Sequence, residues 1–136
     1  MTSKRYTFPS SQKLKRTKLI DDLFQSGKQV RTKDLTLVFK EPNAEIPNCM
    51  QAGFSVSKRK FKRAIDRNRL KRLMREAWRY EKLTLEELLV QSQRKLIVML
   101  IFTGTEMPGL DEVKSKISLL LQELQTQLRK NFSVIP

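Results

Sequence analysis

The stretch AGFSVSKRKFKRAIDRNRLKRLMREAWRY, residues 52–80, decides how the rest of the chain is interpreted. Its first part, Ala52 to Ser57, predicts a strand. From about Arg63 to Tyr80 the apolar side chains recur at helical spacing, as Leu70, Leu73, Met74, Ala77 and Trp78. A strand that leads through a basic connection into an amphipathic helix indicates a helix packed by its apolar face on a small sheet.

The opposite face of this expected helix is strongly positive. A helical wheel places Asn68, Arg72, Arg75 and Arg79 opposite the apolar residues, with Arg69 and Lys71 beside them. Arg67 falls near the edge of the apolar arc, so we expect it to border the sheet. Residues 58–79 carry eleven basic and two acidic side chains, a net charge of +9. Such self-repulsion is destabilising unless a polyanion offsets it, and arginine binds phosphate in a bidentate manner. The pattern therefore favours a nucleic-acid surface over a merely solvated one.

Before this stretch, the chain predicts a basic segment and a short helix. Residues 1–33 carry a net charge of +7, and we expect residues 1–12 to form a flexible N-terminal segment. Thr17 is expected to cap a helix whose apolar face is Leu19, Ile20, Leu23 and Phe24. Gly27 would end that helix in a left-handed conformation.

The remaining elements complete a single α+β domain over residues 1–136. Leu35 to Phe39 predicts a strand, and the Pro- and Asn-containing residues 40–50 predict a hairpin loop to the strand at Ala52. Leu96 to Phe102 predicts a buried strand, and an apolar stripe from Val113 to Leu128 predicts a final helix. The order is helix, strand, strand, helix, strand, helix, with room for one further strand, in a two-layer α/β sandwich.

Catalytic and metal-binding residue types are scarce in this chain. It has no histidine, and its single cysteine, Cys49, stands in a Pro-rich loop without a base to activate it. The adjacent acidic pairs, Asp21–Asp22 and Glu86–Glu87, point about 100° apart on a helix and do not converge on a metal. We therefore expect no catalytic residue, metal site or cofactor in the protein itself.

Hydropathy indicates a protein that stays outside the membrane. The longest apolar run, residues 96–102, is seven residues, against about 20 for a spanning helix. The N-terminus has no apolar segment typical of a secretory signal, and a single cysteine forms no internal disulfide. The expected location is the cytoplasm.

The central stretch resembles the Arg-Asn-Arg signature of the bacterial ribonuclease P protein. The likeness is carried by residues 58–72, KRKFKRAIDRNRLKR, by the preceding GFSVS, and upstream by KLKR at 13–16 and by Leu23, Phe24 and Gly27. It extends over nearly the whole chain. Lys62-Arg63 and Ile20 depart from the family pattern, which often has Gly-Asn and an aromatic there, and no arginine follows Phe102.

The resemblance implies the fold and the function of a ribonucleoprotein subunit. It implies a left-handed β-α-β crossover, although such connections are nearly always right-handed. In this family an RNA subunit with Mg²⁺ cleaves the 5′ leader from precursor tRNA, giving a 5′-phosphate end, and the protein binds both RNAs without an obligate protein partner. The residues expected to bind the catalytic RNA are Lys58, Arg59, Lys60, Lys62, Arg63, Arg67, Asn68, Arg69, Lys71, Arg72 and Arg75. The residues expected to line a cleft for the leader are Lys13, Arg16, Ile20 and Phe24.

Three other functions remain open from the residues alone. A ribosomal-type structural RNA-binding protein would have the same composition. A double-stranded DNA binder is less favoured, because Asn68 is nearly the only base-reading side chain on a helix of phosphate-binding arginines. Binding to an anionic membrane surface is less favoured too, because the helix face opposite the cations is needed for the core.

Overall fold

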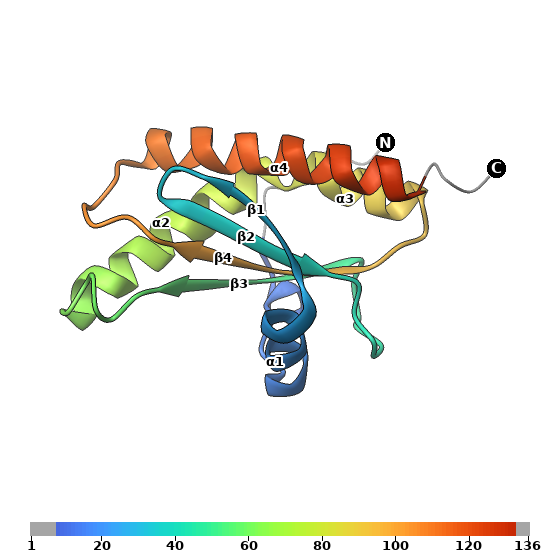
Figure 1. Cartoon of the computed structure of the whole chain (residues 1–136), viewed down its shortest axis with the longest axis horizontal. Helices are drawn as coiled ribbons and strands as arrows, with labels where there is room; N and C mark the ends of the chain where they lie inside the picture. Colours follow the sequence, from blue (N-terminus) through green and yellow to red (C-terminus); the bar gives the residue numbers. More distant parts are fainter. Residues whose placement is uncertain (1–7, 133–136) are drawn as a thin grey trace.

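The computed structural model describes residues 8–132 as one α+β fold. A four-stranded sheet has helices α2, α3 and α4 on one face and α1 on the other (Figure 1). The elements, after a 3-10 turn at Ser10–Gln12, are α1 (Thr17–Ser26), β1 (Lys28–Thr32), β2 (Leu35–Lys40), β3 (Met50–Val56), α2 (Ala64–Glu81), α3 (Leu83–Gln91), β4 (Leu96–Phe102) and α4 (Leu110–Phe132). Within these residues no helix is long and apolar enough to cross a membrane.

The sheet order, β1-β2-β4-β3, contradicts the predicted hairpin between β2 and β3. β4 lies between them, antiparallel to β2 and parallel to β3. The hairpin of this fold joins β1 to β2 instead, through a turn in which Asp34 has a φ of 70°. The physical reason is that β4 is apolar on both faces and needs a strand on each side, so the proline-containing loop passes over its end.

The β-α-β unit of the fold runs from β3 through α2 and α3 to β4. The parallel pairing confirms a crossover, and its left hand stays a prediction from the resemblance. The additional strand for which the sequence left room is β1. Helix α3 was not predicted; it begins directly after Lys82 and buries Leu85 and Leu89 against the helical layer.

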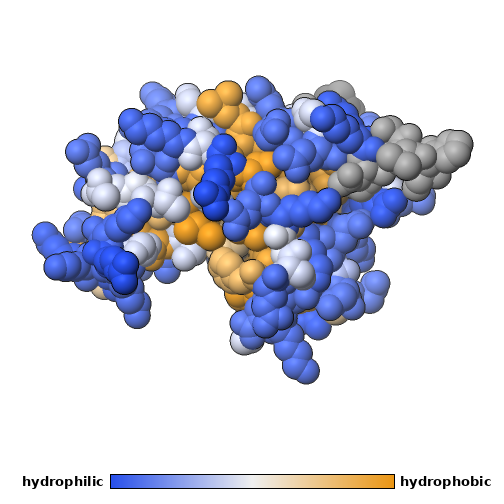
Figure 2. All heavy atoms as spheres, viewed as in Figure 1, coloured by the Kyte–Doolittle hydropathy of each residue, from blue (hydrophilic) through white to orange (hydrophobic). Residues whose placement is uncertain are grey.

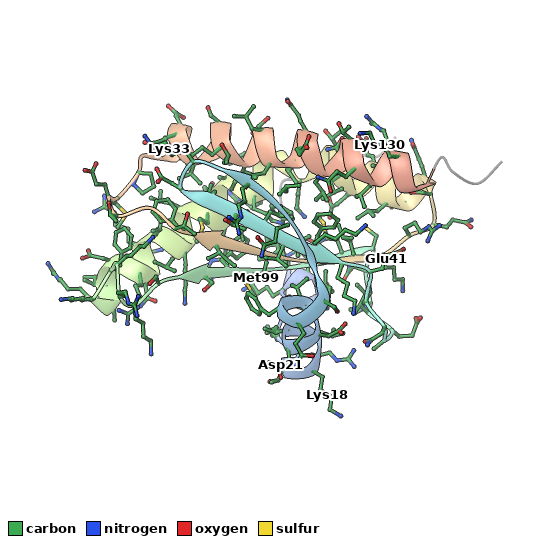
Figure 3. All side chains as sticks on the ribbon, viewed as in Figure 1. Lys18, Asp21, Lys33, Glu41, Met99 and Lys130 are labelled. Carbon is green, nitrogen blue, oxygen red and sulfur yellow. The ribbon has the colours of Figure 1, made fainter. Side chains whose placement is uncertain are left out.

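Strand register sorts the apolar side chains into two clusters. The larger one lies between the sheet and the three helices and includes Leu37, Val98 and Leu100 with the stripe of α4. The smaller one lies under α1, where Leu19 and Leu23 pack on Val38, Ile97 and Met99. Figure 3 shows Met99 on this side of the sheet, beside α1. The two inner strands, β2 and β4, contribute to both clusters and form the centre of the core.

Both expected caps of α1 are wrong in detail. The helix begins at Thr17 with Arg16 as N-cap and no capping side-chain bond. Gly27 follows it with φ −72° and ψ 154°, an ordinary extended conformation. A glycine is needed there for space: an added Cβ would lie 2.4 Å from the carbonyl oxygen of Leu23 and 2.8 Å from Cγ1 of Val38. Crowding by the last turn of α1 and by Val38 of β2 therefore explains Gly27.

The segment before α1 lies along the edge strand β3. The amide of Leu14 donates to the carbonyl of Ala52 at 2.9 Å, and Lys13 pairs with Ala52 as an isolated parallel bridge. The Phe8 ring packs edge-on against Phe54, with centroids 5.7 Å apart. Residues 1–7 of the segment predicted to be flexible lie outside the described residues. Of residues 8–12, Phe8 packs on Phe54, and Ser11 and Gln12 make contacts described below.

Candidate nucleic-acid interface

Helix α2 divides into a buried face and a basic face, as predicted. Leu70, Met74, Ala77 and Trp78 are buried, and Trp78 packs edge-on against Phe54 of β3. The exposed side carries Asn68, Arg69, Arg72 and Arg75. Arg79, the last residue predicted on the basic face, is ion-paired with Glu76 at 2.5 Å, and the hydrogen bond to Glu76 raises the pKa of Arg79. The unpaired positive charge on α2 therefore ends before Arg79.

The loop that leads into α2 is anchored by Phe61 and Arg67. Phe61 is buried, with its ring 5.9 Å from that of Phe102. Arg67 donates hydrogen bonds of 2.8 Å to the carbonyls of Phe61 and Lys62. These hydrogen bonds go to the loop, not to the sheet that Arg67 was expected to border, so its half-buried side chain helps to hold the loop. Lys60 donates to the carbonyl of Thr103, which ties the loop to the end of β4.

Seven of the cations predicted to bind RNA have no protein partner for their side chains within the described residues. Arg63 lies 3.9 Å from Asp66, Arg67 and Lys60 bond to backbone carbonyls, and Asn68 is neutral. The unpaired ones are Lys58, Arg59, Lys62, Arg69, Lys71, Arg72 and Arg75. They occupy the loop and one face of α2, so the structure brings them together as a continuous basic surface. We call these seven the free cations.

The four residues predicted to line a leader cleft are not all brought together. Ile20 and Phe24 lie one helical turn apart on α1, and Phe24 is 51% exposed, so it is not a core residue. Arg16 is exposed and donates a 2.8 Å hydrogen bond to the carbonyl of Glu45. Lys13 instead lines a pocket with Lys71 and Arg75 of α2.

A hollow lies between α1 and the start of α2, with apolar atoms along its inner edge (Figure 2). The register places Thr36, Ile101 and Ser55 in one row across the sheet face on which α1 lies. Ile101 and Ser55 are half-buried there. Sequence reasoning missed this row because it paired β2 with β3. The alternation of side chains within each strand could be read from the sequence, but the expected strand neighbours were wrong.

The absence of a metal or cofactor site stays a prediction; the structure describes residues 8–132. No group of three or more acidic, cysteine or histidine side chains gathers there. Burial raises the pKa of the Cys49 thiol, with Glu86 adding to the effect, so the thiol stays protonated at neutral pH.

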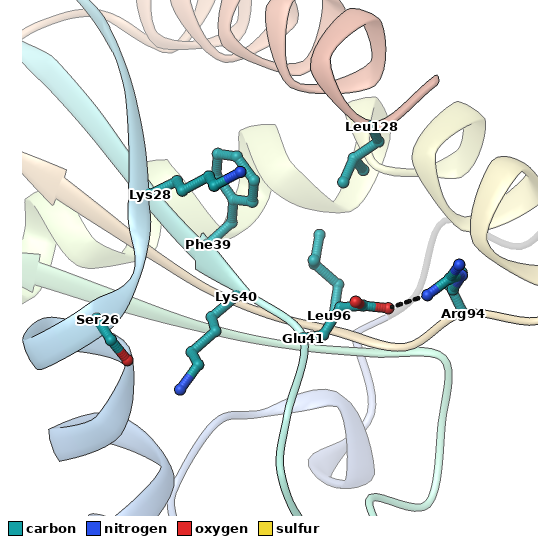
Figure 4. Close-up of a pocket in the computed structure, with 8 residues that line it drawn as sticks. All are labelled: Ser26, Lys28, Phe39, Lys40, Glu41, Arg94, Leu96 and Leu128. Carbon is teal, nitrogen blue, oxygen red and sulfur yellow. Dashed lines mark hydrogen bonds and ion pairs between the residues drawn. The ribbon is translucent and has the colours of Figure 1, made fainter. Parts of the chain in front are cut away.

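A separate cavity of about 500 Å³ lies at the end of the sheet opposite to the loop that leads into α2 (Figure 4). Its floor is apolar, formed by Phe39, Leu96 and Leu128. Two of the cations at its rim have acidic partners: Lys40 lies 2.5 Å from Asp22, and Arg94 lies 3.1 Å from Glu41. The third lining cation, Lys28, has no partner among the described residues, so this cavity carries one unpaired cation against seven on the loop and α2 surface.

Comparison with known proteins agrees with the signature on α2. A model of the family described as Ribonuclease P matches residues 8–125. The chain belongs to the ribonuclease P protein family. The ribonuclease P protein component of Chlorobium phaeobacteroides is 32% identical over 122 residues, which are 82% of this chain and 84% of that protein. That of Legionella pneumophila (strain Lens) is 31% identical over 85 residues, 62% of this chain and 72% of that protein.

Solved ribonuclease P proteins share the fold. The protein from Staphylococcus aureus superposes with a TM-score of 0.62 at 15% identity, covering 83% of this chain and 94% of that one. The protein from Thermotoga maritima gives a TM-score of 0.59 at 23% identity, covering 79% and 94%. Family membership associates this chain with tRNA processing by an endoribonuclease complex.

Proposed function

We propose that this protein is the RNA-binding subunit that holds the catalytic RNA of ribonuclease P and the 5′ leader of precursor tRNA. The endonucleolytic step belongs to the RNA with its Mg²⁺, and the protein supplies positive charge and a surface for the substrate. The observation that carries the proposal is the set of seven free cations on the loop and α2. Clustered cations without acidic partners are the electrostatic footprint of a polyanion.

The binding surface is prearranged for an RNA backbone. Arg67 fixes the lead-in loop through two carbonyls, and the buried face of α2 fixes the helix against β3. The exposed guanidiniums of Arg69, Arg72 and Arg75 therefore start close to their bound positions. Less conformational entropy is lost on binding when the donors are held in this way.

The leader is proposed to lie in the hollow beside α1. Phe24, exposed and with Ile20 one turn away, offers a ring on which a base can stack. Stacking of this kind contributes about 1–3 kcal/mol per base and tolerates any sequence. Such a surface suits a subunit that handles precursors with different leaders, in the cytoplasm where they are made.

The test is cleavage of a 5′-extended precursor tRNA by a ribonuclease P RNA at low Mg²⁺, with and without the protein. We expect the protein to raise the cleavage rate and to cut nothing without that RNA. The double variant Arg67→Ala/Arg72→Ala should lose most of the stimulation. If the protein binds RNA but never stimulates cleavage, the function is that of a structural RNA-binding protein instead.

A further inference from the structure

A pocket lined by cations lies where the N-terminal segment meets α2, at the outer edge of the sheet. β3 is an edge strand, and a pocket of about 230 Å³ opens beside it. Lys13 and Lys15 line one side and Lys71 and Arg75 of α2 line the other, with Phe54 among the apolar lining residues. The pocket therefore joins two segments that are more than fifty residues apart in the sequence.

Among the residues that the structure describes, no acidic side chain lines this pocket. The two acids of α2 nearest to it in sequence are engaged elsewhere, Asp66 with Arg63 and Glu76 with Arg79. Lys15 donates to the hydroxyl of Ser10, at 2.8 Å, and has no acidic partner within residues 8–132. Four cations that converge without an acid repel one another, and an anion between them would relieve that repulsion.

The N-terminal side of the pocket is held in place by a buried lysine. Lys82, 2% exposed, donates from Nζ to Oε1 of Gln12 at 2.5 Å and to Oε2 of Glu86 at 3.2 Å. The side chain of Gln51 donates to the carbonyl of Ser11 at 3.0 Å. These contacts fix the backbone immediately before Lys13, so its position opposite Arg75 is built into the fold.

The shape of the pocket suits a backbone phosphate better than a base. Phe54 makes T-shaped contacts with Phe8 and Trp78, with centroid distances of 5.7 and 6.4 Å, and four of the nine lining residues are cations. Lysine and arginine bind phosphate oxygens as a point charge and a bidentate fork, respectively.

We infer that this pocket holds a backbone phosphate of the ribonuclease P RNA, so that the N-terminal segment and α2 grip one RNA strand together. The inference rests on the proposed function and deepens it. The catalytic RNA is favoured over the leader because Lys71 and Arg75 belong to the α2 surface, whereas Ile20 and Phe24 lie on α1, and Ile20 packs on the other face of the sheet. Lys13 thereby moves from the expected leader cleft to the grip on the catalytic RNA.

The experiment measures binding of ribonuclease P RNA alone to Lys13→Gln, with Lys33→Gln as the matched control. Lys33 has the same charge and is exposed in the β1–β2 turn, away from the β3 edge (Figure 3). Removal of one phosphate-binding cation should weaken binding about five- to eightfold at 0.1 M salt. Lys13→Gln should show this effect and Lys33→Gln should not. Combining Lys13→Gln with Arg75→Gln should cost less than the product of the two effects, because both side chains hold one phosphate.

Binding of precursor tRNA with and without its leader, by the assembled complex, separates the alternatives. If Lys13→Gln weakens only the leader-bearing substrate, the pocket is a leader site and the inference is wrong. If Lys13→Gln changes nothing while Arg72→Gln still weakens RNA binding, the pocket is empty of RNA but the proposed function stands. If the unmodified protein neither binds ribonuclease P RNA nor stimulates cleavage, the proposed function itself fails. Equal thermal unfolding of the variants excludes misfolding as the cause.

Discussion

Raising the salt concentration is the perturbation that most directly tests the basic surface of the loop and α2. The seven free cations set the expected number of phosphate contacts. Counterion release then predicts a slope of log K against log[salt] between about −5 and −6. Between about 50 and 200 mM salt, the affinity for ribonuclease P RNA should fall by about 10³ to 10⁴.

Filter binding with labelled RNA, at one fixed low Mg²⁺ concentration, measures this slope. Arg72 is exposed and has no partner within the described residues, so Arg72→Gln should make the slope shallower by about 0.7–0.9. Lys33→Gln, with the same change of charge, should leave the slope unchanged. A slope shallower than about −2, or an equal effect of both substitutions, would refute the assignment of α2 as the main phosphate-binding surface.

Three further predictions concern packing and the thiol. In urea titrations, Leu70→Ala should lower the free energy of unfolding by about 2–5 kcal/mol, because Leu70 is buried. Arg72→Gln, on the exposed face, should lower it by less than about 0.5 kcal/mol. Similar decreases would mean that the buried and basic faces of α2 are not separate. Gly27→Ala should destabilise by about 1–3 kcal/mol, whereas Gly109→Ala, where an added Cβ meets nothing within 4 Å, should be neutral or stabilising; the opposite order would contradict the packing of α1 on β2. Cys49 should react slowly with a thiol reagent at about pH 8 until urea unfolds the protein, because burial raises the pKa of the thiol. The stability that the protonated thiol contributes is complete below the pKa of the unfolded thiol and is lost as pH rises through the pKa of the folded one. Fast labelling of the native protein would contradict the raised pKa.

The elements with strong periodicity were predictable from the sequence. The stripes of α2 and α4 needed no tertiary information, because their spacing matches a helix. The seven-residue apolar run of β4 was recognised by its length, which suits a buried strand and is short for a helix. Strand order was not predictable in this way. The choice between β3 and β4 as the neighbour of β2 depends on which strand needs a partner on each side. The hairpin signal at residues 40–50 favoured β3, which is the wrong neighbour.

The candidate site was predictable to a similar degree. The free cations follow from the position of Arg69 and Arg72 on the helix, whereas the place of Lys13 does not. Its side chain is positioned by Gln12 and Leu14, which are held by Lys82 and Ala52 through contacts distant in the sequence. A wheel or a motif contains no information about such contacts. The reason for a glycine at position 27 was likewise not predictable, because it includes the contact with Val38 of a neighbouring strand.

The central place of β4 has a consequence for the order in which this protein can fold during synthesis. β3 ends at Val56, but the strand that joins it to β2 is complete only at Phe102. At about 5–20 residues per second, a ribosome adds the intervening residues in roughly 2–9 s. During that time the basic helix has emerged without the sheet that later covers its apolar face. A nascent chain halted before Leu96 therefore has a β1–β2 hairpin and an unpaired β3, and it should stay sensitive to protease until the last strand enters between them.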